Sequence, residues 1–210
     1  DELSNVKSIN KKLFAKQNDL NPQKEIIALL PGSRKQEVSR MMEVMLKVVK
    51  IFPDYQFVIG CAPSLPEEYY RELVGDEDVH MVFNKTYQLL QVASAAVVTS
   101  GTATLETALF YVPEVVCYKG NPISYFIAKK LIKVKYISLV NLIMNKAVVK
   151  ELIQNDLTAE NISVELRQIL SDTKRQRALL EDYEELRFLL GNAGASDNAA
   201  LIIINDLKKQ

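Results

Sequence analysis

The sequence has 210 residues, of which 48% are hydrophobic and 25% are charged, with 26 basic and 26 acidic side chains. These values are typical of a globular chain that is long enough to bury a core without disulfides or metal. A net charge of zero argues against a nucleic-acid-binding protein that works by neutralising phosphates. The single histidine, His80, excludes zinc sites built from several histidines. Cys61 and Cys117 are too few for a disulfide scaffold and indicate buried thiols in a reducing compartment.

The two ends of the chain carry no targeting signal that we recognise. No run of about 18 apolar residues is present, so the sequence predicts no membrane-spanning helix. The polar residues 1–5 do not resemble a signal peptide, and residue 1 is not methionine. We therefore expect a processed chain or a fragment. We expect the polar, lysine-rich residues 1–24 to be a linker.

Short apolar runs alternate with amphipathic segments along the first 120 residues. We expect strands at residues 25–30, 56–60, 79–83, 95–99 and 114–118. We expect helices at residues 35–51, 66–73, 86–93 and 102–110. Because near-continuous apolar strands alternate with helices, the pattern predicts an α/β fold, a Rossmann-like parallel sheet with helices on both faces.

After Pro122 the sequence predicts mostly helix. Amphipathic spacing favours helices at residues 158–170 and 172–190. A closing helix at residues 196–209 has an apolar centre at 201–204. We therefore expect one domain over residues 25–190 and a helical C-terminal extension over residues 191–210.

The first candidate loop joins the first predicted strand to the first predicted helix. In open parallel sheets, ligands bind beyond the carboxyl ends of the strands. The helix that follows Gly32 offers free backbone N–H groups that suit phosphate, and Arg34 adds a two-pronged donor. Two alternatives remain open at this point. Ser33 and Gln36 have the spacing of a capping box, and Arg34 has the features of an ordinary surface residue.

The second candidate loop joins the fourth predicted strand to a helix. The hydroxyls of Ser100, Thr102 and Thr104 and the amides around Gly101 can donate to anionic oxygens. Glu106 can accept the two hydroxyls of a ribose. In the alternative interpretation, Thr102 caps the helix and Glu106 only favours the positive end of its dipole.

Both loops are expected at the same edge of the sheet, where they describe a site for a diphosphate attached to a ribose. Neither loop matches G-x-G-x-x-G or G-x-x-x-x-G-K-[ST]. A dinucleotide-dependent dehydrogenase and a P-loop NTPase are therefore disfavoured.

Several segments in a fixed order resemble the lipid-A-disaccharide synthase family. Residues 29–34, Leu-Leu-Pro-Gly-Ser-Arg, with Glu37-Val38, are similar to that family's LLPGSR-x-x-E-[VI]. Residues 100–106, Ser-Gly-Thr-Ala-Thr-Leu-Glu, are similar to its SGTATLE segment. Shorter matches are P-x-V-V-x-Y at 113–118, Y-[IV]-S-L-P-N at 136–141 and E-L-[LI]-Q at 151–154. One departure is Val140, where the family usually has proline.

The resemblance implies a GT-B glycosyltransferase, which has two Rossmann-like domains with the active site between them. This chain resembles the C-terminal half, which binds the nucleotide sugar. The family transfers 2,3-diacylglucosamine from UDP-2,3-diacylglucosamine to 2,3-diacylglucosamine 1-phosphate (lipid X), with inversion, in lipid A biosynthesis. No metal and no cofactor is implied, because the UDP-sugar is itself the substrate.

The resemblance also implies the residues that bind the donor. The amides of residues 101–104 and Arg34 would stabilise the departing UDP, and Glu106 would hold the ribose. Asn141, Glu151 and Gln154 would line the sugar or the cleft. The general base is expected in the missing N-terminal domain, so we expect this chain alone to bind UDP weakly and to be inactive or nearly so. The full set is Gly32, Ser33, Arg34, Ser100, Gly101, Thr102, Ala103, Thr104, Glu106, Asn141, Glu151 and Gln154.

The expected partners follow from the same resemblance. They are UDP-2,3-diacylglucosamine, lipid X and the missing N-terminal domain, with no nucleic acid. The apolar residues 201–204 are expected to be exposed or to pair with a second copy in a homodimer. We expect a cytoplasmic protein. Lys129, Lys130, Lys133 and Lys135 indicate either peripheral contact with the inner membrane or a solvated lysine face.

Two alternative functions remain open from the sequence. A UDP-GlcNAc 2-epimerase-like enzyme shares the hydroxyl-rich loop and the ribose carboxylate. A non-catalytic module that binds a nucleotide sugar would also fit a chain without a general base.

Overall fold

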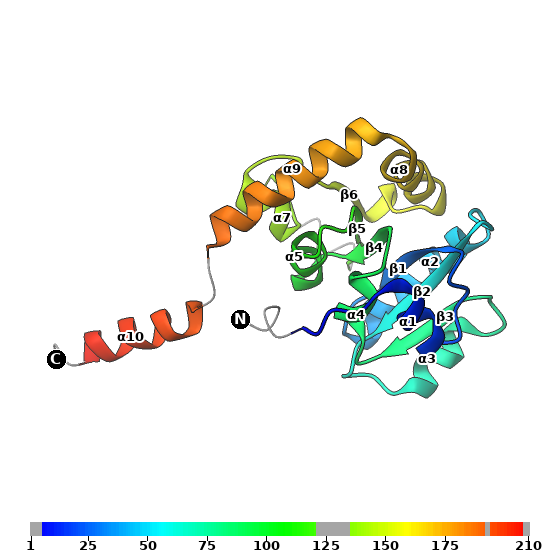
Figure 1. Ribbon diagram of the computed structural model, residues 1–210, viewed down its shortest axis with the longest axis horizontal. Helices are drawn as coiled ribbons and strands as arrows, with labels where there is room; N and C mark the ends of the chain where they lie inside the picture. Colours follow the sequence, from blue (N-terminus) through cyan, green and yellow to red (C-terminus); the bar gives the residue numbers. More distant parts are fainter. Residues whose placement is uncertain (1–5, 121–134, 192–193, 208–210) are drawn as a thin grey trace.

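The computed structural model describes residues 6–120, 135–191 and 194–207. Its strands form one six-stranded parallel sheet in the order β3-β2-β1-β4-β5-β6 (Figure 1). The strands are β1 (Glu25–Leu30), β2 (Tyr55–Cys61), β3 (His80–Phe83), β4 (Ala95–Thr99), β5 (Glu114–Tyr118) and β6 (Lys150–Ile153). The helices are α1 (Lys11–Gln17), α2 (Lys35–Val49), α3 (Glu67–Val74), α4 (Thr86–Leu90), α5 (Thr102–Leu109), α7 (Leu139–Met144), α8 (Ala159–Ser171), α9 (Thr173–Leu190) and α10 (Ala195–Leu207), with the short 3-10 helix η2 (Gln154–Asp156). The expected Rossmann-like fold is confirmed.

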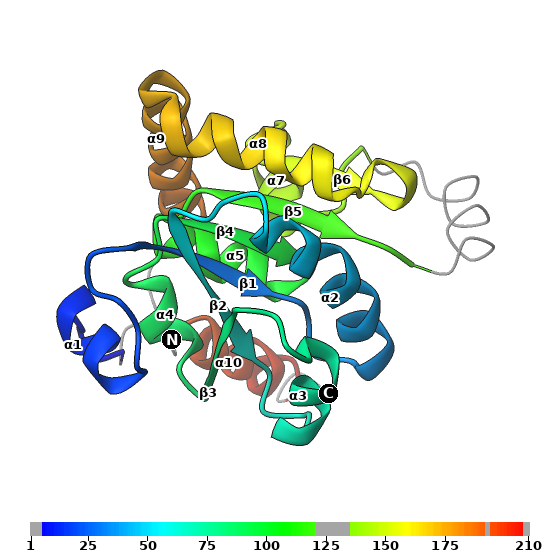
Figure 2. The same ribbon diagram turned by 90° about the vertical axis from the view of Figure 1, so that its right-hand side faces the viewer.

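The sheet separates two hydrophobic clusters because successive strand residues point to opposite faces. On one face Ile27 and Leu29 of β1 pack with α2, α3, α8 and α9. On the other face Ile26 and Ala28 pack with residues of α1 and α4. Figure 2 shows α2 and α8 on one side of the sheet and α1 and α4 on the other. The expected helical cover on both faces is therefore observed.

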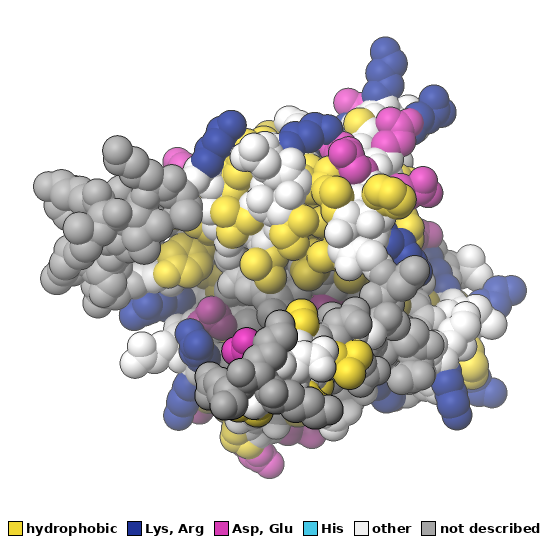
Figure 3. All heavy atoms as spheres, turned by 90° about the vertical axis from the view of Figure 1, so that its left-hand side faces the viewer, with side chains coloured by type: hydrophobic (Ala, Val, Ile, Leu, Met, Phe, Trp, Pro, Cys, Tyr) yellow, Lys and Arg dark blue, Asp and Glu magenta, His cyan; other side chains and the backbone are white. Residues whose placement is uncertain are grey.

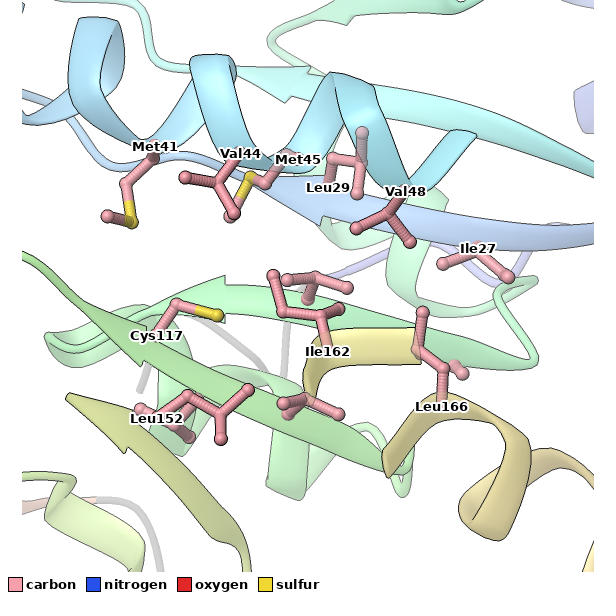
Figure 4. Close-up of a cluster of buried hydrophobic side chains, with 14 of the residues drawn as sticks. Ile27, Leu29, Met41, Val44, Met45, Val48, Cys117, Leu152, Ile162 and Leu166 are labelled. Atoms are coloured by element: carbon pink, nitrogen blue, oxygen red, sulfur yellow. The ribbon is translucent and has the colours of Figure 1, made fainter. Parts of the chain in front are cut away.

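Helix α2 covers the centre of the sheet with one apolar stripe. Val38, Met41, Met45 and Val48 recur at helical spacing and are buried. Figure 4 shows the stripe facing α8, with Met45 and Val48 pointing toward Ile162. The methionines of α2 are therefore core residues, as the spacing predicts. Truncating one of them to alanine is expected to cost about 2–5 kcal/mol of stability.

The order of the strands places the two candidate loops side by side. The chain runs outward from β1 through β2 and β3, then returns to β4 on the opposite side of β1. Leu30 at the end of β1 is paired with Val98 near the end of β4. This reversal is the topological switch point at which open α/β sheets bind ligands. The prediction that both loops share one edge is confirmed.

The segment expected to be a linker contributes to the core instead. Asn10 caps α1 by accepting a hydrogen bond from the Leu13 amide, and Phe14 and Ala15 are fully buried. Leu20 is also buried in the same cluster. The expectation of a linker over residues 1–24 is therefore wrong for residues 10–20. The reason is that a few apolar side chains are enough to dock one short helix on the sheet.

The chain after residue 134 contains a strand that the sequence did not predict. β6 pairs with β5 at the sheet edge, with Leu152 opposite Cys117. Its Lys150 is exposed and its Glu151 is hydrogen-bonded within the protein, so half of this short edge strand is polar, and this hides its strand character. Helices α8 and α9 confirm the expected helices at 158–170 and 172–190. The predicted helical character of residues 121–134 lies outside the described residues.

Helix α10 extends away from the layers of the fold (Figure 1). The exposed fractions of Leu201, Ile202, Ile203 and Ile204 lie between 46% and 70%. Figure 3 views the molecule from the α10 side, and hydrophobic side chains gather on the upper part of that face, above the level of α10. The expectation of an exposed apolar centre is confirmed, and pairing with a second copy remains a prediction. Among the described residues, no helix has both the length and the apolar character needed to cross a membrane.

Candidate functional site

A cavity of about 570 Å³ lies at the switch point, beyond the carboxyl ends of the central strands. This volume suits a small-molecule ligand. Its walls come from segments far apart in the chain. The described residues that line it are Val6, Lys7, Leu30, Gly32, Ser33, Glu37, Gly60, Ala62, Pro63, Asn84, Lys85, Thr86, Tyr87, Gln88, Thr99, Ser100, Gly101, Thr102, Ala103 and Glu106.

The loop after β1 is held in shape by a carboxylate. The Ser33 amide donates to Glu37 Oε2 at 3.1 Å. Gly32 has a φ of +105°, and a Cβ at this position would lie 2.1 Å from Glu37 Oε2. The φ therefore favours glycine, and a side chain here would displace the Glu37 carboxylate from its present position. Ser33 and Gln36 do not form a capping box, so that interpretation is wrong. The N-cap of α2 is Arg34, and no side chain makes a capping hydrogen bond to this helix.

Arg34 is exposed at the start of α2. It does not belong to the described residues that line the cavity. The loop that carries it lies at the cavity, but the guanidinium itself is not placed there. Its contact with a diphosphate therefore remains a prediction that requires its side chain to move.

The loop after β4 forms the opposite wall and leads into α5. Ser100, Gly101, Thr102 and Ala103 line the cavity, so the N-terminal end of α5, where backbone N–H groups lack partners within the helix, borders it. The Thr102 hydroxyl does not cap the helix, whose N-cap is Gly101. The interpretation of Thr102 as a cap is therefore wrong.

Two of the three predicted hydroxyl donors already donate within the protein. The Thr104 hydroxyl donates to the Gly101 carbonyl at 2.8 Å, and Thr104 is fully buried outside the cavity lining. The Ser100 hydroxyl donates to the Ile137 carbonyl at 3.1 Å. Thr104 therefore shapes the turn, and the groups that face the cavity here are backbone amides and Thr102.

Glu106 lines the cavity one helical turn after Thr102. The Tyr87 hydroxyl donates to Glu106 Oε1 at 3.3 Å. The Tyr87 ring in turn packs on Phe110, with centroids 5.6 Å apart. Helix α4 thereby positions the carboxylate that the sequence assigns to a ribose.

The segment after β3 forms a wall of the cavity that the sequence analysis missed. Asn84, Lys85, Thr86, Tyr87 and Gln88 all line the cavity. The available signal was a polar stretch that directly follows a strand at the same sheet edge. Asn84 adopts a φ of +57°, a conformation that asparagine tolerates better than most residues.

Two polar atoms of the cavity walls are buried without a hydrogen-bond partner. They are Gln88 Oε1 and Thr99 Oγ1. Buried polar groups in folded proteins are usually paired, so an unpaired group needs an explanation. Both atoms are shielded from solvent, so a ligand in the cavity would reach them only if these side chains shifted.

Asn141 and Glu151 are joined in a buried hydrogen-bond network and do not belong to the described cavity lining. Asn141 Nδ2 donates to the Val149 carbonyl and to Glu151 Oε1, both at 2.9 Å. Asn141 Oδ1 accepts from the amides of Val148 and Val149. Glu151 also accepts from the Ser138 amide and hydroxyl. In this structure the pair stabilises the turn between α7 and β6, and contact with the sugar remains a prediction.

Gln154 follows β6 and also lies outside the described cavity lining. Its φ is +54°, and its Nε2 is buried without a hydrogen-bond partner. A non-glycine residue with this φ is uncommon. Because Gln154 does not line the cavity, its contact with the sugar remains a prediction.

The two cysteines are free and buried, as the sequence predicts. Burial raises the pKa of the Cys61 thiol to about 12 and raises that of Cys117 as well. Neither thiol is therefore poised as a nucleophile at neutral pH. Within the described ranges, no group of three or more His, Cys, Asp or Glu side chains could hold a metal ion.

Comparison with known proteins identifies the family. The model of the family described as lipid-A-disaccharide synthetase matches residues 3–203. The chain belongs to this family. It is 41% identical over 190 residues to the lipid-A-disaccharide synthase of Syntrophus aciditrophicus (strain SB), covering 87% of this chain and 50% of that relative. It is 35% identical over 202 residues to that of Coxiella burnetii (strain CbuG_Q212), covering 94% and 54%. The chain thus spans about half the length of these synthases.

Solved structures share the fold at low sequence identity. The calicheamicin glycosyltransferase CalG4 is similar with a TM-score of 0.58 and 14% identity, over 86% of this chain and 42% of that one. The UDP-GlcNAc 2-epimerase from Neisseria meningitidis, bound to UDP-GlcNAc, has a TM-score of 0.54 and 16% identity, over 95% and 49%. These similarities show that this chain has the Rossmann-like fold found in GT-B glycosyltransferases.

Proposed function

We propose that this chain is the donor-binding half of a lipid-A-disaccharide synthase and that its cavity binds UDP-2,3-diacylglucosamine. The observation that carries the proposal is that the loops after β1 and β4 and the Glu106 carboxylate line one cavity. The amides proposed for the diphosphate and the carboxylate proposed for the ribose then belong to the same cavity. Membership of the synthase family supports the same donor.

Each wall of the cavity has a chemical role in the proposal. The amides at the start of α5 and in the Gly32–Ser33 turn donate to the diphosphate. Glu106, oriented by Tyr87, accepts the ribose hydroxyls. Gln88 and Thr99 lie in the wall that would surround the remainder of the nucleotide.

In the whole protein the proposed reaction is one inverting displacement. The acceptor hydroxyl of lipid X attacks the anomeric carbon as the bond to UDP breaks, and its proton passes to a general base. The amides around Gly101 stabilise the charge that grows on UDP. Arg34 would add to this effect if its side chain turned into the cavity. UDP itself is the leaving group, so we propose no cofactor and no metal.

We propose that the general base belongs to a second domain that the longer relatives have. This chain alone would then bind UDP and catalyse no transfer. Because the proposed substrates are lipids, we propose that the whole protein acts at the cytoplasmic face of the inner membrane. Membrane contact and a solvated face both remain open for four lysines, of which Lys129, Lys130 and Lys133 lie outside the described residues.

A calorimetric titration with UDP tests the donor site. Glu106→Gln is expected to weaken binding roughly tenfold, since it removes the charge that accepts two hydroxyls. Arg34→Ala tests the guanidinium in the same way. The control is Glu72→Gln, an exposed carboxylate on α3. Equal affinity in the wild type and in Glu106→Gln would refute the site, and transfer by the isolated chain would refute the assignment of the base.

The two alternative functions are separated by other measurements. Interconversion of UDP-GlcNAc by the chain would favour an epimerase. Upstream sequence that encodes no second Rossmann-like domain would favour a binding module.

A further inference from the structure

Residues 6–9 are here called the strap, and two of them line the cavity. Val6 and Lys7 line it together with Tyr87 and Glu106. In Figures 1 and 2 the start of the described chain passes beside α4. The strap precedes α1, so a segment outside the strands and helices of the sheet fold reaches the cavity.

One glutamine side chain fixes the strap to α4. Gln91, the C-cap of α4, accepts a hydrogen bond from the Ile9 amide at 2.8 Å through Oε1. Its Nε2 donates to the Lys7 carbonyl at 3.1 Å. The primary amide thus pairs with the strap backbone as a neighbouring strand would. On the other side the strap is continuous with α1, whose Phe14 is fully buried.

The strap lies beside the carboxylate assigned to the ribose. Gln91 and Tyr87 are four residues apart, so they lie on the same side of α4. Tyr87 donates to Glu106. The backbone of Lys7 is therefore held on the same side of α4 as the hydroxyl that orients Glu106.

The balance of charged residues in the cavity lining indicates that Lys7 could bind an anionic ligand. The charged residues in its described lining are Lys7, Glu37, Lys85 and Glu106, which sum to zero. A nucleoside diphosphate is an anion, and two carboxylates in its site oppose its binding. The Lys85 ammonium already donates to Asn18 Oδ1 at 2.7 Å. Within the described part of the chain, the Lys7 ammonium has neither an ion pair nor a hydrogen bond.

We propose that Lys7 is a further ligand-binding residue of this cavity and that its ammonium contacts the diphosphate of the nucleotide. Gln91 is the positioning residue that holds Lys7 there. The inference rests on the proposed function, because it takes a nucleoside diphosphate as the ligand. It adds the strap to a site otherwise built from loops at the ends of strands.

Titration of the 210-residue chain with UDP at low and high salt tests the inference. Lys7→Met keeps most of the side-chain length and removes the charge, and it is expected to weaken binding about fivefold at low salt. Wild type and Lys7→Met should converge at about 0.5 M salt, where the contact is screened. Gln91→Leu should weaken binding to a similar degree, and Lys7→Met should have little further effect in that background.

The matched control is Lys12→Met, which removes the same charge from an exposed position on α1. Unchanged UDP affinity in Lys7→Met at low salt would overturn the inference. So would an equal loss in Lys12→Met, or a loss in Lys7→Met that persists at high salt. If the folded wild type binds no UDP, the proposed function itself fails. If Glu106→Gln weakens UDP binding and Lys7→Met does not, only the inference about the strap fails.

Discussion

The Tyr87 hydroxyl donates to Glu106 Oε1 at 3.3 Å and so connects α4 to α5 across the cavity. The Tyr87 ring packs on Phe110, the C-cap of α5, with an interplanar angle of 34°. Ring packing limits the positions of the hydroxyl, and the hydroxyl limits the rotamers of the carboxylate. Glu106 is therefore presented to a ligand in one orientation.

Replacing Tyr87 with phenylalanine should separate orientation from packing. Tyr87→Phe keeps the ring on Phe110 and removes the hydrogen bond to Glu106. We expect UDP affinity to fall roughly threefold, because the carboxylate regains rotamers that a ligand must then restrict. Titration calorimetry measures the change. A Tyr111→Phe control alters a partly buried tyrosine outside the described cavity lining, and an equal loss there would contradict the explanation.

Replacing Gly32 with alanine should damage the loop after β1. The added Cβ would meet Glu37 Oε2 at 2.1 Å, and the φ of +105° is unfavourable for any L side chain. We expect a loss of about 2–3 kcal/mol in the free energy of unfolding and a weaker affinity for UDP. Denaturant unfolding and calorimetry measure the two effects.

Gly75 provides the matched control for that substitution. Its φ is +56°, and a Cβ there would contact nothing within 4 Å. Gly75→Ala should therefore lose about 1–3 kcal/mol through its backbone conformation alone and leave UDP affinity unchanged. If both variants lose the same stability, the contact with Glu37 is not what requires glycine at position 32.

Replacing Asn141 should lower the stability of the fold. Its side chain makes four buried hydrogen bonds, two through Nδ2 and two through Oδ1. Asn141→Ala leaves the amides of Val148 and Val149 without partners, so we expect a loss of about 2–4 kcal/mol in the free energy of unfolding. Chemical denaturation measures this, with exposed Asn161 as the control position. A loss of less than about 0.5 kcal/mol would show that the network is not formed in solution.

The buried carboxyl of Glu114 should make the chain less stable as pH rises. Its oxygens have no hydrogen-bond partner, and burial raises its pKa well above the usual 4.5. The unfolded chain therefore loses this proton at lower pH than the folded chain does. Between the two pKa values the free energy of unfolding should fall by up to about 1.4 kcal/mol per pH unit.

Glu114→Met tests that pH dependence. Methionine fills a similar volume and leaves no carboxyl to ionise, so the variant should be more stable than wild type at pH 7 to 8. The advantage should shrink toward pH 4, where the carboxyl is protonated in both states of the wild type. Denaturant unfolding across this range measures it, and a constant difference at all pH values would contradict the assignment. The neighbouring Tyr183 hydroxyl is also buried, which raises its pKa, and it is retained in both proteins.

The central strands and the switch point could be predicted from the sequence, and the reasons are local. Strands β4 and β5 are apolar runs bounded by Ser94 and Pro113, so their limits are marked along the chain. The pairing of β1 with β4 follows from the rules that govern parallel sheets. The glycine and the hydroxyls after these strands then indicated the correct edge. The site could be located without any contact between distant residues being known.

The remaining features depend on contacts that no local pattern carries. α1 is lysine-rich, and only its docking on the sheet shows why Phe14 is buried. β6 is short and polar because it lies at an edge. The cavity wall formed by the strap depends on a pair of hydrogen bonds from Gln91, 84 and 82 residues away in sequence. Asn141 and Glu151 were expected at the sugar, yet their partners are each other, the Ser138 hydroxyl and the nearby backbone.

Helix α10 bears on how any of these measurements should be made. Its isoleucines and leucines are open to solvent, and such a surface favours self-association as the protein is concentrated. Apparent dissociation constants would then depend on how much protein is in the calorimeter cell. Repeating each titration over a dilution series, with light scattering recorded in parallel, would separate the affinity of the cavity for UDP from self-association through α10.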